Sequence, residues 1–135
     1  MIVNVLRFRF KDSADAATRA AVLAAMRRTA SVESVSFGTV GQDLGDPAEG
    51  FTHAYCVGVA DLEALERYLY DPVHLAGDFE ILPHLERLVP ARLSDDPDPE
   101  LGARIADMVA RKVRTYPEWG RLLEAIPDTT IAIHS

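Results

Sequence analysis

LERYLYDPVH, residues 65–74, is the stretch that decides the fold. It begins with a helical pattern that Pro72 interrupts, because the proline ring disfavours a helical conformation at Asp71 and removes one backbone donor. A straight helix, at about 100° per residue, would point Tyr68 and His74 well apart. A bend at Pro72 can instead aim the phenol and the imidazole into one cavity. On these residues alone, the plainer interpretation is favoured, in which Tyr68 fills the core and His74 starts a helix.

The segments around this stretch alternate between strand and helix patterns. Strands are predicted by period-two alternation and flanking turn residues over residues 2–10, 34–40, 51–59 and 88–93. Helices are predicted over residues 14–29, 61–70 and 74–82, the last two separated at Pro72. The order β-α-β-β-α-β indicates an α+β protein with a ferredoxin-like antiparallel sheet and both helical segments on one face.

The second face of this predicted sheet has no helix to cover it. Several strands place apolar residues there, and an uncovered apolar face requires a partner. We therefore expect a symmetric homodimer in which two sheets pack together as an α+β barrel.

Residues 94–99, SDDPDP, form the one clear breaker inside the chain. We expect a barrel domain over residues 1–94 and a helical extension over residues 95–135 that docks on the domain or on the partner subunit. Pro117 suits the first turn of a second helix in the extension, and residues 129–133 could form a short strand. The basic run Arg111–Arg114 is interpreted as a solvated helix face, with phosphate binding as the alternative.

The composition excludes several classes of partner. The formal net charge is −7, and an acidic surface repels both nucleic acids and anionic membranes. A single cysteine, Cys56, forms no intrachain disulfide, and the sequence shows neither a secretion signal nor an apolar run of membrane-spanning length. We therefore expect a cytoplasmic protein, and the alanine- and arginine-rich composition suggests a bacterial one.

Four segments together make the chain recognisable: residues 3–12, 35–41, 50–54 and 65–74, the last followed by Ile81-Leu82-Pro83. They resemble the stress-responsive α/β-barrel family, known as Dabb, across about residues 1–94. The resemblance implies a dimeric α+β barrel. The most specific segment, residues 65–74, is also similar to that of a family member that cyclises a linear polyketide, olivetolic acid cyclase.

The resemblance also implies a site without metal or organic cofactor. His74 matches the catalytic base of the cyclase, Tyr68 its proton-donating phenol, and His53 a further histidine near the cavity. The chain departs from the cyclase at Asn4, which replaces a histidine and cannot act as a base. The residues expected to line a pocket for a small hydrophobic carbonyl compound, beside Asn4 and His53, are Phe8, Phe37, Tyr55, Leu69, Leu75 and Phe79.

The residues give less support to other chemistries. His74 with Asp78, and Glu80 with His84, have the i, i+4 spacing of metal ligands, but the two pairs are rotated apart and Pro83 breaks the second. Neither a nucleophile elbow nor a glycine-rich phosphate loop is present. Two hypotheses remain: a cofactor-free enzyme performing aldol cyclisation or related proton transfer, and a non-catalytic stress-responsive homodimer that at most binds a ligand.

Overall fold

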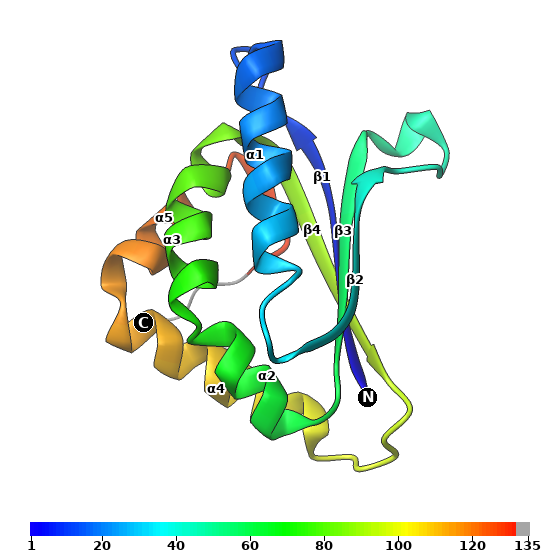
Figure 1. The fold of residues 1–135 in the computed structure, drawn as a ribbon, viewed down its shortest axis with the longest axis vertical. Helices are drawn as coiled ribbons and strands as arrows, with labels where there is room; N and C mark the ends of the chain where they lie inside the picture. Colours follow the sequence, from blue (N-terminus) through cyan, green and yellow to red (C-terminus); the bar gives the residue numbers. More distant parts are fainter. Residues whose placement is uncertain (132–135) are drawn as a thin grey trace.

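The computed structural model describes residues 1–131 of the chain (Figure 1). In chain order its elements are β1 (Ile2–Phe10), α1 (Ala16–Thr29), β2 (Val35–Gln42), η1 (Pro47–Glu49), β3 (His53–Val59), α2 (Leu62–Leu69), α3 (Pro72–Ile81), η2 (Leu82–His84), β4 (Leu85–Ser94), α4 (Leu101–Thr115), α5 (Pro117–Glu124) and β5 (Asp128–Thr129). Elements η1 and η2 are single 3₁₀ turns. Within the described residues, no helix combines the length and the apolar character that crossing a membrane requires.

The five strands form one sheet in the order β2-β3-β1-β4-β5. The β1–β3, β1–β4 and β2–β3 pairs are antiparallel, which confirms the predicted ferredoxin-like unit. Strand β5 is an addition: it pairs parallel to β4, with Asp128 opposite Arg87, and makes the sheet mixed. The strand predicted at residues 129–133 is thus only partly confirmed: the observed strand begins one residue before the prediction and ends at Thr129, and residues 132–133 lie outside the described part of the chain.

One face of the sheet carries the core. Helices α1 and α3 lie side by side in front of it (Figure 1), in contact where Gly77 faces Thr29. A Cβ atom at Gly77 would stand 2.9 Å from the Thr29 hydroxyl oxygen, so only glycine allows this approach. Phe8 of β1 and Leu85 of β4 are completely buried beneath these helices.

The predicted break at Pro72 is confirmed. Helix α2 ends at Leu69 and α3 begins at Pro72, which occupies the first helical turn where its missing N–H costs nothing. Asp71 caps the new helix, its carboxylate accepting a hydrogen bond from the Val73 backbone N–H at 2.8 Å. Such a cap is worth about 1 kcal/mol, so the bend is specified locally by two adjacent residues.

The C-terminal extension packs on the helical side of the same chain. Helix α4 contacts α2, α5 contacts α3 and η2, and β5 extends the sheet edge beside β4. One prediction for this segment was wrong: Lys112, from the run interpreted as a solvated face, is fully buried. Its position follows from spacing, because Leu101, Ile105 and Met108 are the other buried residues of α4 and Lys112 continues their stripe.

The opposite face of the sheet, which we call the outer face, is not covered by any described helix (Figure 1). It carries Phe37, 47% exposed, and Leu93, 60% exposed, with Val3, Val5 and Cys56 half-buried between them. Gly58 leaves room for the Phe37 ring, since a Cβ atom there would overlap it at 2.0 Å. The apolar outer face expected from the strand pattern is therefore present.

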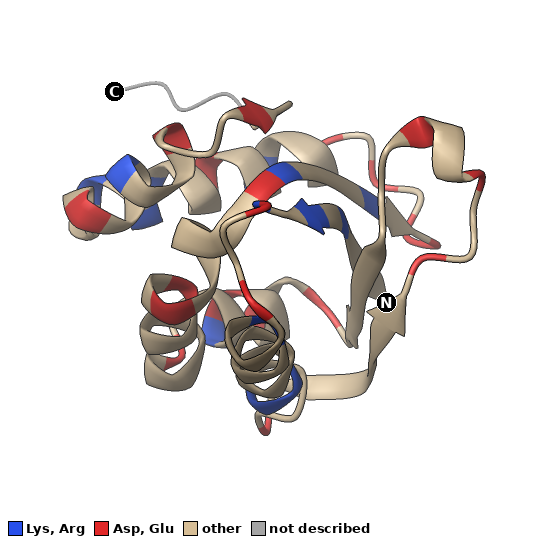
Figure 2. Ribbon diagram, turned by 90° about the horizontal axis from the view of Figure 1, so that it is seen from above, with Lys and Arg blue, Asp and Glu red and all other residues tan. Residues whose placement is uncertain are grey.

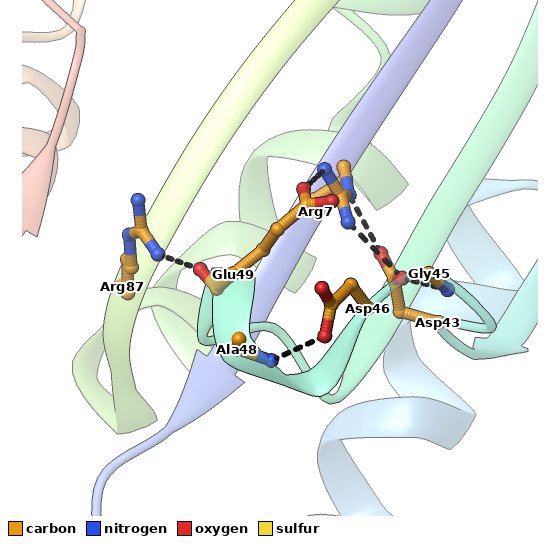
Figure 3. Close-up of polar contacts among 7 residues, drawn as sticks. All are labelled: Arg7, Asp43, Gly45, Asp46, Ala48, Glu49 and Arg87. Atoms are coloured by element: carbon orange, nitrogen blue, oxygen red, sulfur yellow. Dashed lines mark hydrogen bonds and ion pairs between the residues drawn. The ribbon is translucent and has the colours of Figure 1, made fainter.

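At one end of the outer face, the β2–β3 loop is held by arginines (Figure 3). Arg7 donates hydrogen bonds to Asp43 at 2.7 Å and to Glu49 at 2.6 Å, and Arg87 donates to the Glu49 backbone carbonyl. The guanidinium groups of Arg7 and Arg87 each lie 4.3 Å from the centre of the Phe51 ring. Basic positions on the strands are visible in Figure 2, and acidic positions are seen in many of the loops.

Candidate active site

Tyr68 and His74 meet across the bend between α2 and α3. The two ring centroids are 4.5 Å apart, and both residues are buried. His74 is fixed by backbone, because its Nδ1 lies 2.9 Å from the carbonyl oxygen of Tyr68. The interruption at Pro72 therefore places the phenol and the imidazole side by side, although they are six residues apart.

The Tyr68 hydroxyl lies 2.5 Å from the Tyr55 hydroxyl of β3. Burial, reinforced by Tyr55, raises the pKa of Tyr68 well above its ordinary value, while the Asn4 side chain acts in the opposite direction. Burial likewise raises the pKa of Tyr55. Both phenols are therefore neutral proton donors at physiological pH. The Asn4 side-chain oxygen is buried and has no hydrogen-bond partner among the described residues.

The second nitrogen of His74 faces a carboxylate. Its Nε2 lies 3.3 Å from Oδ2 of Asp78, one turn further along α3. A carbonyl oxygen only accepts hydrogen bonds, so Nδ1 carries a proton and donates a hydrogen bond to the backbone carbonyl of Tyr68. The second nitrogen, Nε2, thus stands beside a carboxylate, and this contact is an ion pair whenever the ring carries two protons.

Asp78 is also held by the C-terminal extension. Nε1 of Trp119, on α5, donates to the same Oδ2 atom at 2.8 Å. Burial alone would raise the pKa of the Asp78 carboxyl, but His74, Lys112 and the Trp119 bond outweigh it and leave the pKa below its ordinary value. Asp78 is thus an anion on which α3, α4 and α5 converge.

Lys112 of α4 completes this group. Its ammonium lies 4.2 Å from the centre of the Trp119 ring and has no hydrogen-bond partner among the described residues. Removal from water lowers its pKa to about 8, despite the nearby Asp78 charge. We call His74, Asp78, Lys112 and Trp119 the Asp78 cluster.

The other residues expected at the site are only partly gathered. Phe8 and Leu69 are core residues. His53 shares the inner face with Tyr55 but stacks on Phe8 at a centroid distance of 5.6 Å, and burial lowers the pKa of its imidazole. Phe37 lies on the outer face, away from the pair. The cause is a bulge between Val35 and Phe37, which turns the two side chains to opposite faces.

Leu75 and Phe79 point away from the pair toward the extension. They line a surface cleft of about 460 Å³, whose other residues, Thr115 to Glu118 and Arg121, belong to α4, α5 and their junction. A second cleft, of about 630 Å³, lies between α2 and α4 and is lined by Glu63, Glu66, Arg67, Tyr70, Arg111, Arg114 and Thr115. Neither cleft is lined by Tyr68 or His74.

Sequence reasoning missed Lys112 and Trp119 as neighbours of His74, and it noticed Asp78 only as a metal ligand. Glu80, of the same metal hypothesis, instead lies on the surface 3.3 Å from Arg28. Within residues 1–131, no three His, Cys, Asp or Glu side chains are grouped so that they could hold a metal ion. The signal available for Lys112 was its place in the apolar stripe of α4.

Comparison with known proteins agrees with the ferredoxin-like fold. The model of the stress responsive A/B barrel domain, Dabb, matches residues 2–91. The chain belongs to the Dabb family. Helices α4 and α5 of the Asp78 cluster follow the matched residues.

Several solved structures share the fold. A Dabb family protein from Mesorhizobium loti is 18% identical, with a TM-score of 0.62 over 70% of this chain and 96% of that one. A dimeric ferredoxin-like protein of unknown function from Thermobifida fusca is 22% identical, with a TM-score of 0.62 over 69% and 89%. A hydroxynitrile lyase from Passiflora edulis is 22% identical, with a TM-score of 0.61 over 71% and 94%. No curated protein matches the sequence.

Proposed function

We propose that this Dabb protein is a cofactor-independent enzyme acting on a small hydrophobic carbonyl compound, by polyketide-cyclase-like aldol cyclisation or related enolate chemistry. The observation that carries the proposal is the buried contact between Tyr68 and His74. A phenol kept protonated beside an imidazole is the pair needed to form and stabilise an enolate. Structural neighbours in this fold include a lyase as well as proteins of unknown function.

The geometry assigns a role to each atom. Nδ1 of His74 is committed to the Tyr68 carbonyl, so Nε2 is the atom that takes a proton from the substrate carbon, once it is deprotonated and released from Asp78. Tyr68 then donates a hydrogen bond to the enolate oxygen in place of its bond to Tyr55. The enolate carbon forms a bond to a second carbonyl carbon of the same substrate, and the resulting alkoxide takes a proton from His74. Asn4 has a buried oxygen free to accept a hydrogen bond from the substrate.

Proton exchange tests this function without the natural substrate. In deuterated buffer, the protein should catalyse deuterium incorporation at the α-carbon of a simple ketone such as 2-heptanone, followed by proton NMR. His74→Ala should reduce the rate at least about 100-fold and Tyr68→Phe at least about 10-fold, because general acid–base catalysis contributes roughly 10²–10⁴. Asp43→Asn, at the β2–β3 loop, is the matched control and should leave the rate unchanged. Equal rates in wild type and His74→Ala would refute the enzyme proposal.

A non-catalytic, ligand-binding protein is the second candidate. It is favoured by one observation: the Tyr68 hydroxyl is satisfied by Tyr55, and neither described cleft is lined by the pair. In that case 2-heptanone would shift protein resonances in titrations without any deuterium incorporation.

We also propose that the protein is a homodimer whose outer faces pack together, and that it acts in a bacterial cytoplasm. The exposed Phe37 and Leu93 support the dimer, and some neighbours in this fold are described as dimeric. Sedimentation should give twice the chain mass of 14.8 kDa. Leu93→Glu should produce monomers, because it buries an unpaired charge in the interface. A wild-type monomer at micromolar concentration would contradict this proposal.

A further inference from the structure

The Asp78 cluster joins the Dabb helices to residues outside the matched family segment. His74 and Asp78 belong to α3, within residues 2–91, whereas Lys112 and Trp119 belong to α4 and α5. Two ring nitrogens approach a single oxygen, since His74 Nε2 lies 3.3 Å and the donor Trp119 Nε1 lies 2.8 Å from Oδ2 of Asp78. The extension therefore competes directly with His74 for the carboxylate.

We propose that Asp78 is a positioning residue that holds His74 as an imidazolium, and that Trp119 and Lys112 of the C-terminal extension set how strongly it does so. The hydrogen-bond pattern carries this inference. Nδ1 faces a backbone carbonyl at 2.9 Å and Nε2 faces a carboxylate. With Nδ1 donating to the Tyr68 carbonyl, a neutral ring would place the Nε2 lone pair 3.3 Å from the Asp78 carboxylate, which is unfavourable in a buried site.

The charges around the ring agree with this assignment. Asp78 on α3 and Tyr68 on α2 contact the ring; Lys112 on α4 acts on Asp78, Tyr55 on β3 bonds to Tyr68, and both phenols stay neutral. Asp78 is therefore the one anion shared by two cations, His74 and Lys112. Lys112 weakens the hold of Asp78 on His74, because it repels the imidazolium and draws on the same carboxylate charge.

In the proposed reaction the consequence is a change of role for His74. Paired with Asp78, the ring is a proton donor; it becomes a base only after Nε2 loses its proton and turns from Asp78. This part of the inference rests on the proposed function. The charge assignment does not, because it concerns the protein without substrate.

The test is an NMR titration of the His74 ring in the full-length protein and three variants. Asp78→Asn removes the anion and should lower the pH midpoint of the His74 resonances by at least about one unit. Lys112→Met and Trp119→Phe should each raise it, by roughly half a unit, because both free the carboxylate for His74. If these residues only supported the fold, the pH midpoint of the His74 resonances would move in the same direction in all three variants or would not move.

The wild type provides a second measurement if a variant fails to fold. Nitrogen-15 spectra near pH 6.5 should show both His74 ring nitrogens protonated, with similar chemical shifts. A single protonated nitrogen, or a midpoint unchanged by Asp78→Asn, would overturn the inference. Since no substrate is involved, these results stand apart from the ketone-exchange assay. If no ketone exchange is seen but the His74 titration gives the expected shifts, the cluster holds the charge of His74 without the proposed catalysis.

Discussion

Two clusters of charged side chains lie on opposite sides of this sheet, and they differ in what surrounds them. On the outer face, the Arg7 and Glu49 side chains of the loop cluster are 30% and 50% exposed, and Asp43, the other partner of Arg7, is 7% exposed. Among the helices, the His74 and Asp78 side chains are 11% and 15% exposed, and Lys112 is fully buried. The ion types are similar, but Arg7 and Glu49 beside Asp43 reach water, whereas the cations beside Asp78 are buried.

This difference separates anchoring from chemistry. The outer cluster positions the β2–β3 loop through an arginine that never titrates: its hydrogen bonds to Asp43 and Glu49 raise the pKa of Arg7 further. In the Asp78 cluster every charge depends on the others, because removing one partner leaves another buried without compensation. We expect perturbations of the Asp78 cluster to change stability and charge state together, and perturbations of the loop cluster to change little.

Asp78→Asn should have the largest effect. It leaves the buried Lys112 and the His74 ring without their anion, and breaking a buried ion pair from one side costs about 3–5 kcal/mol. We expect a loss of about 3 kcal/mol in the free energy of unfolding, measured by urea denaturation at pH 7. A loss below 1 kcal/mol would show that the two clusters contribute equally little to the free energy of unfolding, contrary to the difference in burial.

The lowered pKa of Lys112 should appear as a change in stability at alkaline pH. Its pKa is about 8 in the folded protein and 10.5 for an unperturbed lysine, so the unfolded state binds more protons between these values. The free energy of unfolding therefore rises with pH from about 8 to 10.5, by on the order of 2–3 kcal/mol. Lys112→Met should remove this rise when the two proteins are compared by urea denaturation across the window. An identical pH dependence in both would show that Lys112 titrates normally.

Trp119→Phe keeps an aromatic ring over Lys112 but removes the donor to Asp78. A hydrogen bond to a charged group contributes about 1.5–3 kcal/mol, so we expect a loss of about 2 kcal/mol in thermal or urea unfolding. Trp119→Tyr is a useful companion, because it restores a polar donor at a different position. Full stability of the Phe variant would mean that the extension docks by apolar contact alone.

Asp43→Asn should have the smallest effect. Asp43 accepts two hydrogen bonds from Arg7 and its side chain is only 7% exposed, but its partner Arg7 is 30% exposed and keeps contact with water. We expect a change below about 1 kcal/mol, further reduced by added salt. The same urea measurement in 0.1 and 1 M sodium chloride checks this. A larger, salt-insensitive loss would place the loop cluster in the same class as the Asp78 cluster.

The sequence predicts the framework because strand and helix patterns are local. Alternation in residues 2–10 and the Pro72 break each depend on a few neighbouring residues, and both are confirmed. The face of Phe37 was beyond such reasoning, since one extra residue at the β2 bulge reverses every side chain that follows. Leu75 was misplaced for a similar reason: the inward face of α3 is set by His74, Gly77 and Ile81, one step away.

The candidate site was predictable only in part. Tyr68 and His74 are brought together by a local bend, whereas Lys112 and Trp119 reach Asp78 through tertiary packing of a segment more than thirty residues later. A lysine within a basic run is usually solvated, and only the 101–105–108–112 spacing indicated otherwise. The catalytic roles and the division at residue 94 stay predictions.

The central claim is that α3 and the C-terminal extension share one buried set of charges centred on Asp78. A double-mutant cycle between Asp78→Asn and Lys112→Met, measured as free energies of unfolding at pH 7, tests it most directly. We predict that Lys112→Met alone costs less than about 1 kcal/mol and that the double variant recovers about 2 kcal/mol of the Asp78→Asn loss, because the stranded cation is gone. Additive losses, with no coupling between the two positions, would contradict the claim.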